Sequence, residues 1–371
     1  MLNLQVDDEE SQGLSALLLE TEAEVETYSP SEIEATKEID RQLLIDSRQF
    51  ASEQRWLSWW HLWSTLAVLC VTALVAALAE PLWLRLLASL VTGLTLVRVF
   101  IVYHDYQHHA VLKGSPLATA VLSLYGYVML TPPSVWKRSH DHHHRHNSKL
   151  FGASIGSFPI MTTDNYQAAT PRERLEYRIA RSPMIIVLGY LSVFMFGMCV
   201  RPLLMDPRRH LDAIASLVVH FGLVAGLVMW DGWLTAGLAF VLPACVASAA
   251  GAYLFYIQHN FPGAKIRRCE EWSYTKAALK SSSFLELGPI LHWFTGNIGY
   301  HHVHHLNAKI PFYRLPEAMA GLEPLQAPTR VSLRLADIIA CLRLKLWDTR
   351  LDRFVSFGEA RPIALGTAIK S

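Results

Sequence analysis

The chain has 371 residues, of which 51% are hydrophobic and 18% charged, and its formal net charge is +1. This balance of charge argues against a nucleic-acid-binding protein, which carries an excess of lysine and arginine. The hydrophobic residues gather in long uncharged segments, which indicates a protein that spans a membrane.

The N-terminal segment, residues 1–55, is acidic. Its first forty residues carry twelve aspartates and glutamates against one lysine. This composition argues against a cleavable signal peptide, which starts with basic residues and continues with an apolar stretch. We expect a solvated, disordered tail that leads into an amphipathic helix.

Four apolar segments have the length that crosses a membrane, since a bilayer core takes a helix of about 20 apolar residues. The second segment, residues 81–103, can cross the membrane only if Arg85 and Arg98 face protein or extend toward the lipid headgroups. A short turn at Asp231-Gly232 joins the third to the fourth. We therefore predict an all-α integral membrane fold with four transmembrane helices in two hairpins, interfacial helices and a cytoplasmic histidine-box cap. The four helices are expected within residues 62–79, 81–103, 213–230 and 233–257.

Two further uncharged segments, residues 116–133 and 183–200, are predicted to be interfacial or re-entrant helices. Counting the second as a span would put His259 on the opposite side of the membrane from the 140–146 histidines. Lysines and arginines gather on the histidine side, which the positive-inside rule assigns to the cytoplasm. We expect both termini and the histidines in the cytoplasm, and the protein in the inner membrane of the cell.

The histidines follow a pattern. Of 17 histidines, twelve fall in three short windows: HDYQHH at 104–109, HDHHHRH at 140–146 and HHVHH at 301–305. On a helix, residues three or four positions apart share one face. Each window therefore presents a histidine cluster in one direction, which a metal site requires and a solvated polar patch does not.

The number of histidines indicates two metal ions, because zinc sites use only three or four ligands per ion. His259, at the end of the fourth segment, lies on the same side of the membrane as the windows. The chain has no E-x-x-H pattern, which excludes the soluble di-iron bundles, and its five scattered cysteines include no C-x-x-C. Four lone histidines are interpreted as interfacial or hydrogen-bonded core residues: His61, His210, His220 and His292.

The boxes H-x3-HH, H-x2-HH and H-x2-HH, the isolated QH and the runs NIGYHHVHHL and IPFYRL resemble the membrane fatty acid desaturase family. The resemblance covers about residues 56–315, and we expect amphipathic cytoplasmic helices in residues 316–371. It implies two iron ions with these ligands: His104, His108, His140, His143, His144, His259, His301, His304 and His305. Some members have H-x4-H in the first box, which would select His109 in place of His108, and the sequence leaves this open. His142, His146 and His302 fall outside the motif, and His302 is interpreted as lying behind the ligands or facing solvent.

The resemblance implies that the irons activate O2 and remove hydrogens from an acyl chain of a lipid, acyl-CoA or acyl-carrier substrate. Two electrons would come from a cytochrome- or ferredoxin-type donor, because the chain has no G-x-G-x-x-G fingerprint for a dinucleotide. Such donors are usually acidic, although the basic residues on this side would equally serve topology and lipid binding. The candidate docking residues are Lys137, Arg138, Lys265, Arg267 and Arg268.

Other interpretations stay open at this point. Asp105 and Asp141 adjoin ligand candidates and would either accept a histidine N–H or face solvent. Alkane, carotenoid or sterol hydroxylases share the same boxes, and we prefer a desaturase on the HHVHHL and P-x-Y-R-L patterns. A histidine-rich metal transporter is a lesser alternative, because the third and fourth segments contain little polar beyond His220.

Overall fold

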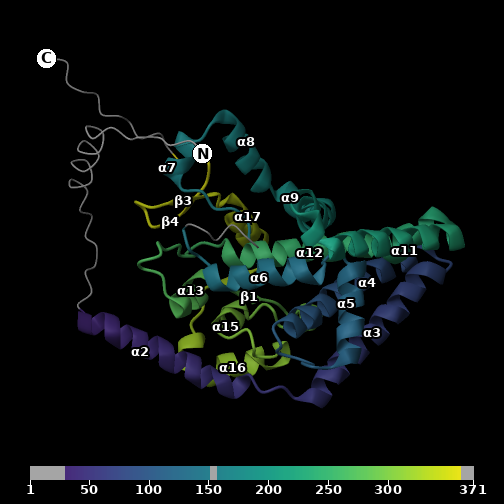
Figure 1. Ribbon diagram of the computed structural model, residues 1–371, viewed down its shortest axis with the longest axis horizontal. Helices are drawn as coiled ribbons and strands as arrows, with labels where there is room; N and C mark the ends of the chain where they lie inside the picture. The colour runs from purple at the N-terminus through teal and green to yellow at the C-terminus, as the bar shows by residue number, and fades with distance from the viewer. Residues whose placement is uncertain (1–29, 151–156, 361–371) are drawn as a thin grey trace. The chain divides into compact units, whose positions relative to one another are not determined.

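The computed structural model describes residues 30–150 and 157–360 (Figure 1). The chain divides into two compact units, residues 1–42 and 43–371. In the first unit the structure describes only the beginning of α2 (Pro30–Asp46), so the acidic segment 1–29 lies outside the described residues. The second unit is mainly helical and contains all the other elements.

Three helical segments of the described part are long and apolar enough to cross a membrane. They are α3 (Arg55–Leu78), α4 (Leu82–Gln107) and the continuous run of α11 (Leu211–Ala236), η4 (Gly237–Val241) and α12 (Leu242–His259). The run has 49 residues, but its backbone leaves helical geometry at Asp231 and Gly232. Gly232 has φ 82° and ψ −179°, a conformation that residues with a side chain rarely adopt. One helix therefore ends and another begins at the predicted turn.

α4 lies at the centre of the apolar bundle. It packs along α3 on one side and along α12 on the other. Gly93 permits the close approach to α12, because a Cβ atom added there would lie 2.7 Å from the Val246 side chain and 3.0 Å from the Pro243 carbonyl oxygen. A residue without a side chain is therefore needed where these two helices cross.

Both arginines of α4 face protein, as the sequence required of a spanning helix. Arg85 donates to the hydroxyl of Thr235 at 2.7 Å, and this hydrogen bond connects α4 to α11. Arg98 is 3% exposed. Its Nε donates to Thr65 at 3.0 Å and its Nη1 to the carbonyl oxygen of Trp293. Protein groups thus replace water around the guanidinium group of Arg98, while Arg85 is half-buried.

Two shorter apolar segments pack against the bundle. The first is α5 (Pro116–Val128), whose 13 residues rise about 20 Å, less than the thickness of a bilayer core. The second continues through α9 (Pro183–Val187), the π-helical η2 (Tyr190–Val200) and α10 (Arg201–Met205). The length of α5 agrees with the predicted interfacial or re-entrant placement.

Short helices cap one end of the bundle. Several begin at a proline in the first turn, where the missing N–H costs nothing, and α8 begins with a capping box of Thr170 and Glu173. These helices are α6 (Pro133–His146), α7 (Thr163–Ala168), α8 (Pro171–Ala180), α13 (Tyr274–Ser281), α14 (Pro289–Phe294), α15 (His301–Leu306), α16 (Leu315–Gly321) and α17 (Leu335–Arg343). The 3-10 helices are η1 (Ser47–Phe50), η3 (Pro207–Arg209), η5 (Phe312–Arg314) and η6 (Glu323–Leu325).

The all-α prediction missed two small sheets. β1 (Phe284–Glu286) pairs in parallel with β2 (Arg330–Ser332), and β3 (Leu346–Asp348) pairs antiparallel with β4 (Arg353–Val355). Three of these strands lie in residues 316–371, where amphipathic helices were expected, so that expectation is wrong for the strands; α16 and α17 are the helices of this segment. The side chain of Asp348 accepts backbone N–H groups from Arg350 and Leu351, which forms the turn between β3 and β4.

Candidate metal centre

Nine histidines from four elements gather into two groups. The five-histidine group contains His104, His108, His140, His144 and His304. The four-histidine group contains His143, His259, His301 and His305. Within each group the candidate ligand nitrogens all lie within 4.8 Å of one another. His104 lies in the last turn of α4 and His108 directly follows this helix; residues 140–144 lie on α6, His259 ends α12 and residues 301–305 lie on α15.

Helical periodicity explains how α6 serves both groups. His140 and His144 are four residues apart and share one face, while His143 is rotated by about 100° from His144. α15 repeats this arrangement, with His304 in the five-histidine group and His301 and His305 in the other. The two short helices therefore link the two groups.

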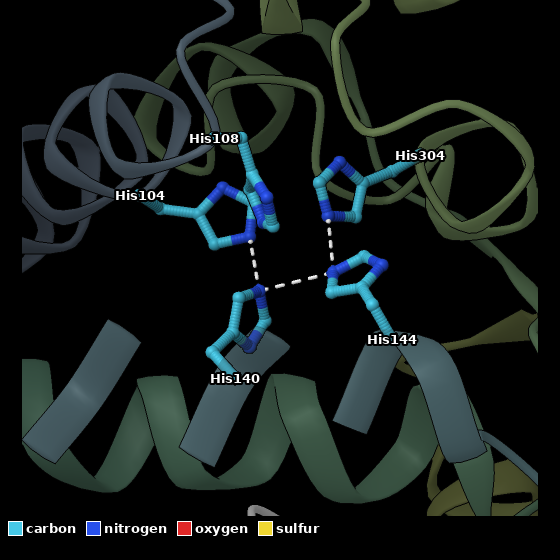
Figure 2. A group of neighbouring side chains, drawn as sticks. All are labelled: His104, His108, His140, His144 and His304. Atoms are coloured by element: carbon cyan, nitrogen blue, oxygen red, sulfur yellow. Dashed lines mark hydrogen bonds between the residues drawn. The ribbon is translucent and has the colours of Figure 1, made fainter. Parts of the chain in front are cut away.

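In the five-histidine group the rings point toward a common centre (Figure 2). Nε2 of His140 lies 2.9 Å from Nε2 of His104 and 3.1 Å from Nε2 of His144. Nε2 of His304 lies 3.1 Å from Nε2 of His144. The ring of His108 completes the group, with its centroid 4.6 Å from that of His144.

The four-histidine group is equally compact. Nε2 of His259 lies 2.8 Å from Nε2 of His301, 3.1 Å from that of His143 and 3.2 Å from that of His305. Metal–imidazole bonds are about 2.1 Å long, so two ligands at right angles have nitrogens about 3 Å apart. The nitrogen spacing of both groups fits metal coordination, and imidazole is a ligand suited to iron.

Electrostatics favour the neutral, metal-binding form of these rings. Burial is the main cause, and positive charge on neighbouring histidines is the next. Together they lower the pKa well below its usual value for His108, His140, His143, His144, His301, His304 and His305. Neutral imidazole carries the free lone pair that a metal ion needs.

The structure distinguishes between the two candidates in the first box. α4 ends at Gln107, and His108 follows as its C-cap with φ −78°, so its ring still turns toward the group. His109 has φ 58°, is exposed and lies outside both groups. The reversal of the chain at His109 directs its side chain away from the other histidines.

Two partners outside the groups orient individual rings. Nδ1 of His104 lies 2.9 Å from Oδ1 of Asp105, which is 1% exposed, and the other carboxylate oxygen accepts the N–H of Phe312 at 2.7 Å. Nδ1 of His259 lies 3.1 Å from the carbonyl oxygen of Ser281. A proton held on Nδ1 leaves Nε2 free to bind a metal.

The remaining candidates have other contacts. Asp141 pairs with Lys137 at 2.8 Å. His142 and His146 stack on each other at 4.0 Å. His302 is completely buried, not solvent-facing, and its Nε2 lies 3.0 Å from the carbonyl oxygen of Leu325.

Three of the lone histidines form hydrogen bonds within the fold, as expected, and His210 does so with Arg138 at 3.0 Å. His61 contacts Arg98 at 3.1 Å, and His220 lies between the hydroxyl of Tyr190 and the carbonyl oxygen of Val128, at 2.6 Å from each. The contacts of His61 and His220 connect neighbouring helices, and none of the three histidines lies in a metal group.

Aromatic residues around the groups were not predicted from the histidine spacing. Trp136 stacks on His140 with a ring-centroid distance of 4.4 Å, and Phe255 lies 4.8 Å from His143. Trp136 precedes His140 by one helical turn and Phe255 precedes His259 by one turn. The helical spacing therefore accounts for the contact of Trp136 with His140, whereas the contact of Phe255 with His143 depends on how α12 packs against α6.

A small apolar cavity lies among the helices of the bundle. Phe100 lines it one helical turn before His104, and the two ring centroids are 6.5 Å apart. Phe194, Ala247 and Gly251 also line it. The cavity therefore offers an apolar space next to the histidines.

Comparison with known proteins identifies the family. The family model for fatty acid desaturase matches residues 80–335, and a "Fatty acid desaturase" of Bacillus subtilis (strain 168) is 33% identical over 285 residues. That alignment covers 76% of this chain and 79% of the relative. The chain belongs to the fatty acid desaturase family. The desaturase is thus an oxidoreductase that acts on acyl chains, and its apolar helices make it an integral membrane protein.

More distant relatives carry more specific names. The "sn-1 oleoyl-lipid 12-desaturase" of Synechocystis sp. is 23% identical over 239 residues, covering 64% of this desaturase and 68% of the relative. The "sn-1 acyl-lipid omega-3 desaturase (ferredoxin)" of Nostoc sp. is 24% identical over 255 residues, covering 64% and 66%. Both names refer to acyl groups on lipids.

Proposed function

We propose that the chain is an O2-dependent di-iron enzyme that introduces a double bond into a lipid- or carrier-bound acyl chain. One observation carries this proposal: two groups of imidazole nitrogens converge with the spacing of metal ligands in a member of the desaturase family. The proposed iron ligands are His104, His108, His140, His144 and His304 at one site and His143, His259, His301 and His305 at the other.

Two irons bound there would supply O2 activation and hydrogen removal, using two electrons from outside the chain. The protein would hold both sites at a fixed separation, because α6 and α15 contribute to both groups. Asp105 would hold the Nδ1 proton of His104, and the Ser281 carbonyl oxygen that of His259. The lone pair on each Nε2 is then directed to the metal side of the ring.

The apolar cavity beside Phe100 would hold the saturated chain and exclude water from it. In this proposal, the depth that the chain reaches in the cavity sets the position of the new double bond. This is an effect of positioning and needs no further reactive group.

The proposed topology has four spans in two hairpins. α3 and α4 form the first, and the segments of Leu211–His259 before and after Gly232 form the second. This count supports a shared metal centre, because the ends of α4 and α12 then emerge on the same side of the membrane. By the positive-inside rule we assign that side to the cytoplasm, and we expect the membrane to be the inner membrane of the cell.

The electrons would come from a ferredoxin- or cytochrome-type protein, and the name of the Nostoc relative supports a ferredoxin. Of the five predicted docking cations, Lys137 is paired with Asp141, and Lys265 and Arg267 are paired with Asp352. The other two, Arg138 and Arg268, have no ion pair within the described residues. We expect Arg268→Glu to lower the donor-dependent rate at low salt, and the difference to shrink as salt is added.

Lipid analysis tests the function. A host that expresses the protein should gain unsaturated acyl chains, measured by gas chromatography and mass spectrometry, and a host expressing His143→Ala should not. Hydroxylated chains in place of unsaturated ones would assign the enzyme to the hydroxylases. Unchanged lipids in the presence of bound iron would contradict an acyl substrate.

A further inference from the structure

A second pocket adjoins the four-histidine group. It is open to the outside, and His143 and His259 are among the residues that line it. Phe158 and Phe255 supply an apolar wall, and Arg181 lies among the other lining residues. The pocket therefore combines metal-site histidines, an apolar surface and a permanent positive charge.

Arg181 is 2% exposed, and its hydrogen-bonding capacity is only partly used. Its Nη2 donates to Oδ1 of Asn260 and, at 2.8 Å, to the carbonyl oxygen of Leu344. Its buried Nε has no hydrogen-bond partner among the described residues. Arginine stays charged in proteins. The Nε of Arg181 is therefore a buried donor of a charged group that has no acceptor among the described residues, which is unfavourable.

The surroundings of Arg181 do not neutralise it. Lys345 is 9% exposed and donates to the carbonyl oxygen of Arg181 at 2.6 Å. Burial, and then the charge of Arg181, lower the pKa of Lys345 to about 8. No aspartate or glutamate is among the described residues that line the pocket, and neither cation has an ion pair in the described chain. Two buried cations without a carboxylate favour the binding of an anion from outside the chain.

We propose that Arg181 binds an anionic oxygen, from a phosphate or a carboxylate, on the polar head of the acyl substrate. This proposal rests on the proposed function and extends it to the class of substrate head. The apolar wall suits the first part of the acyl chain, while the guanidinium suits an oxyanion. The head would then lie beside the four-histidine group, and Arg181 would act as a positioning residue.

Arg181 also has a structural contact that the experiment must separate from ligand binding. Asn260, which accepts from Arg181, donates to the carbonyl oxygens of Cys341 and Leu344 at 2.7 and 3.2 Å. Loss of the arginine could therefore loosen the segment that follows α17. A structural loss would weaken every ligand alike, whereas loss of a charge contact weakens only anionic ligands.

Binding to the purified full-length protein in detergent tests the proposal. The probes are dioctanoyl phosphatidylglycerol, laurate and the uncharged dioctanoylglycerol. We expect the wild type to prefer one or both anionic probes, and Arg181→Gln to weaken the preferred probe by roughly ten- to a hundredfold, as expected for a charge-assisted hydrogen bond. Phosphatidylglycerol alone would indicate a lipid phosphate, and laurate alone a free carboxylate.

Arg178→Gln is the matched control, because Arg178 is exposed one turn before Arg181 and does not line the pocket. It should leave all three affinities unchanged. Arg181→Lys keeps the positive charge and should therefore retain the preference for anionic probes. If Arg181→Gln does not fold, Arg181→Lys is compared with the wild type instead. Equal wild-type binding of neutral and anionic probes, or an equal loss of all three in Arg181→Gln, would overturn the proposal.

These results are independent of turnover. A wild-type protein that makes no double bonds but binds anions through Arg181 would refute the proposed function and leave the binding site standing. Normal lipid desaturation together with charge-independent binding would refute the binding site alone.

Discussion

His143 Nε2 lies 3.1 Å from His259 Nε2, although 116 residues separate the two in sequence. The first is on α6 and the second is the last residue of α12, so the contact joins the second histidine box to the end of the long apolar run. Both rings belong to the four-histidine group, which we propose as one of the two metal sites.

Replacing His143 by alanine should reduce desaturation by more than about a hundredfold, because the four-histidine group would keep only three nitrogens. His146 is the matched control from the same helix, since it stacks on His142 and lies outside both groups. His146→Ala should retain near-normal activity in the lipid assay. An equal effect of the two variants would refute the assignment of helix faces.

The first histidine box gives a second paired comparison. His108→Ala should lower the iron content of the purified protein, because its ring belongs to the five-histidine group. His109→Ala should leave the iron content unchanged, because that side chain is exposed. Elemental analysis of both variants distinguishes the two positions, and the reverse result would show that the H-x4-H spacing applies.

Asp105→Asn tests the contact behind His104. The asparagine can still accept the Phe312 N–H, but it lacks the negative charge that holds the Nδ1 proton of His104. Metal affinity should fall by about ten- to a hundredfold, the usual cost of losing such a partner. Titration with a competing chelator measures this loss, and Asp141→Asn, which removes a carboxylate paired with Lys137, is the control. Equal affinities in the two variants would contradict the role of Asp105.

The spacing of the histidines indicated which of them lie together, because residues three or four positions apart share a helix face and that spacing is visible in the chain. It did not predict how the nine divide between two groups. That division depends on where α6 and α15 meet the ends of α4 and α12, which is a property of tertiary packing. The choice of His108 over His109 likewise depends on where α4 ends and on the positive φ of His109.

Asp105 and Asp141 had equal standing in the sequence, because each adjoins a ligand candidate. The structure separates them through partners distant in sequence: Asp105 accepts the N–H of Phe312, 207 residues away. The strands in residues 316–371 were also missed. β3 is buried along its whole length, so it lacks the alternation of exposed and buried residues that marks a surface strand.

The crossing of α4 and α12 makes a stability prediction. Gly93→Ala places a methyl group against Val246 and should lower the free energy of unfolding by about 1–3 kcal/mol through overpacking. Gly226→Ala in α11 is the control, since a Cβ atom there has no neighbour within 4 Å. Thermal unfolding in detergent compares them, and equal melting temperatures would show that the helices do not cross closely at Gly93.

The metal content of the purified wild-type protein tests the central claim most directly. The two groups of converging imidazoles predict about two iron ions per chain. Elemental mass spectrometry after removal of loosely bound metal measures this number. One zinc ion per chain, or no retained metal in a folded protein, would contradict the di-iron assignment and the function built on it.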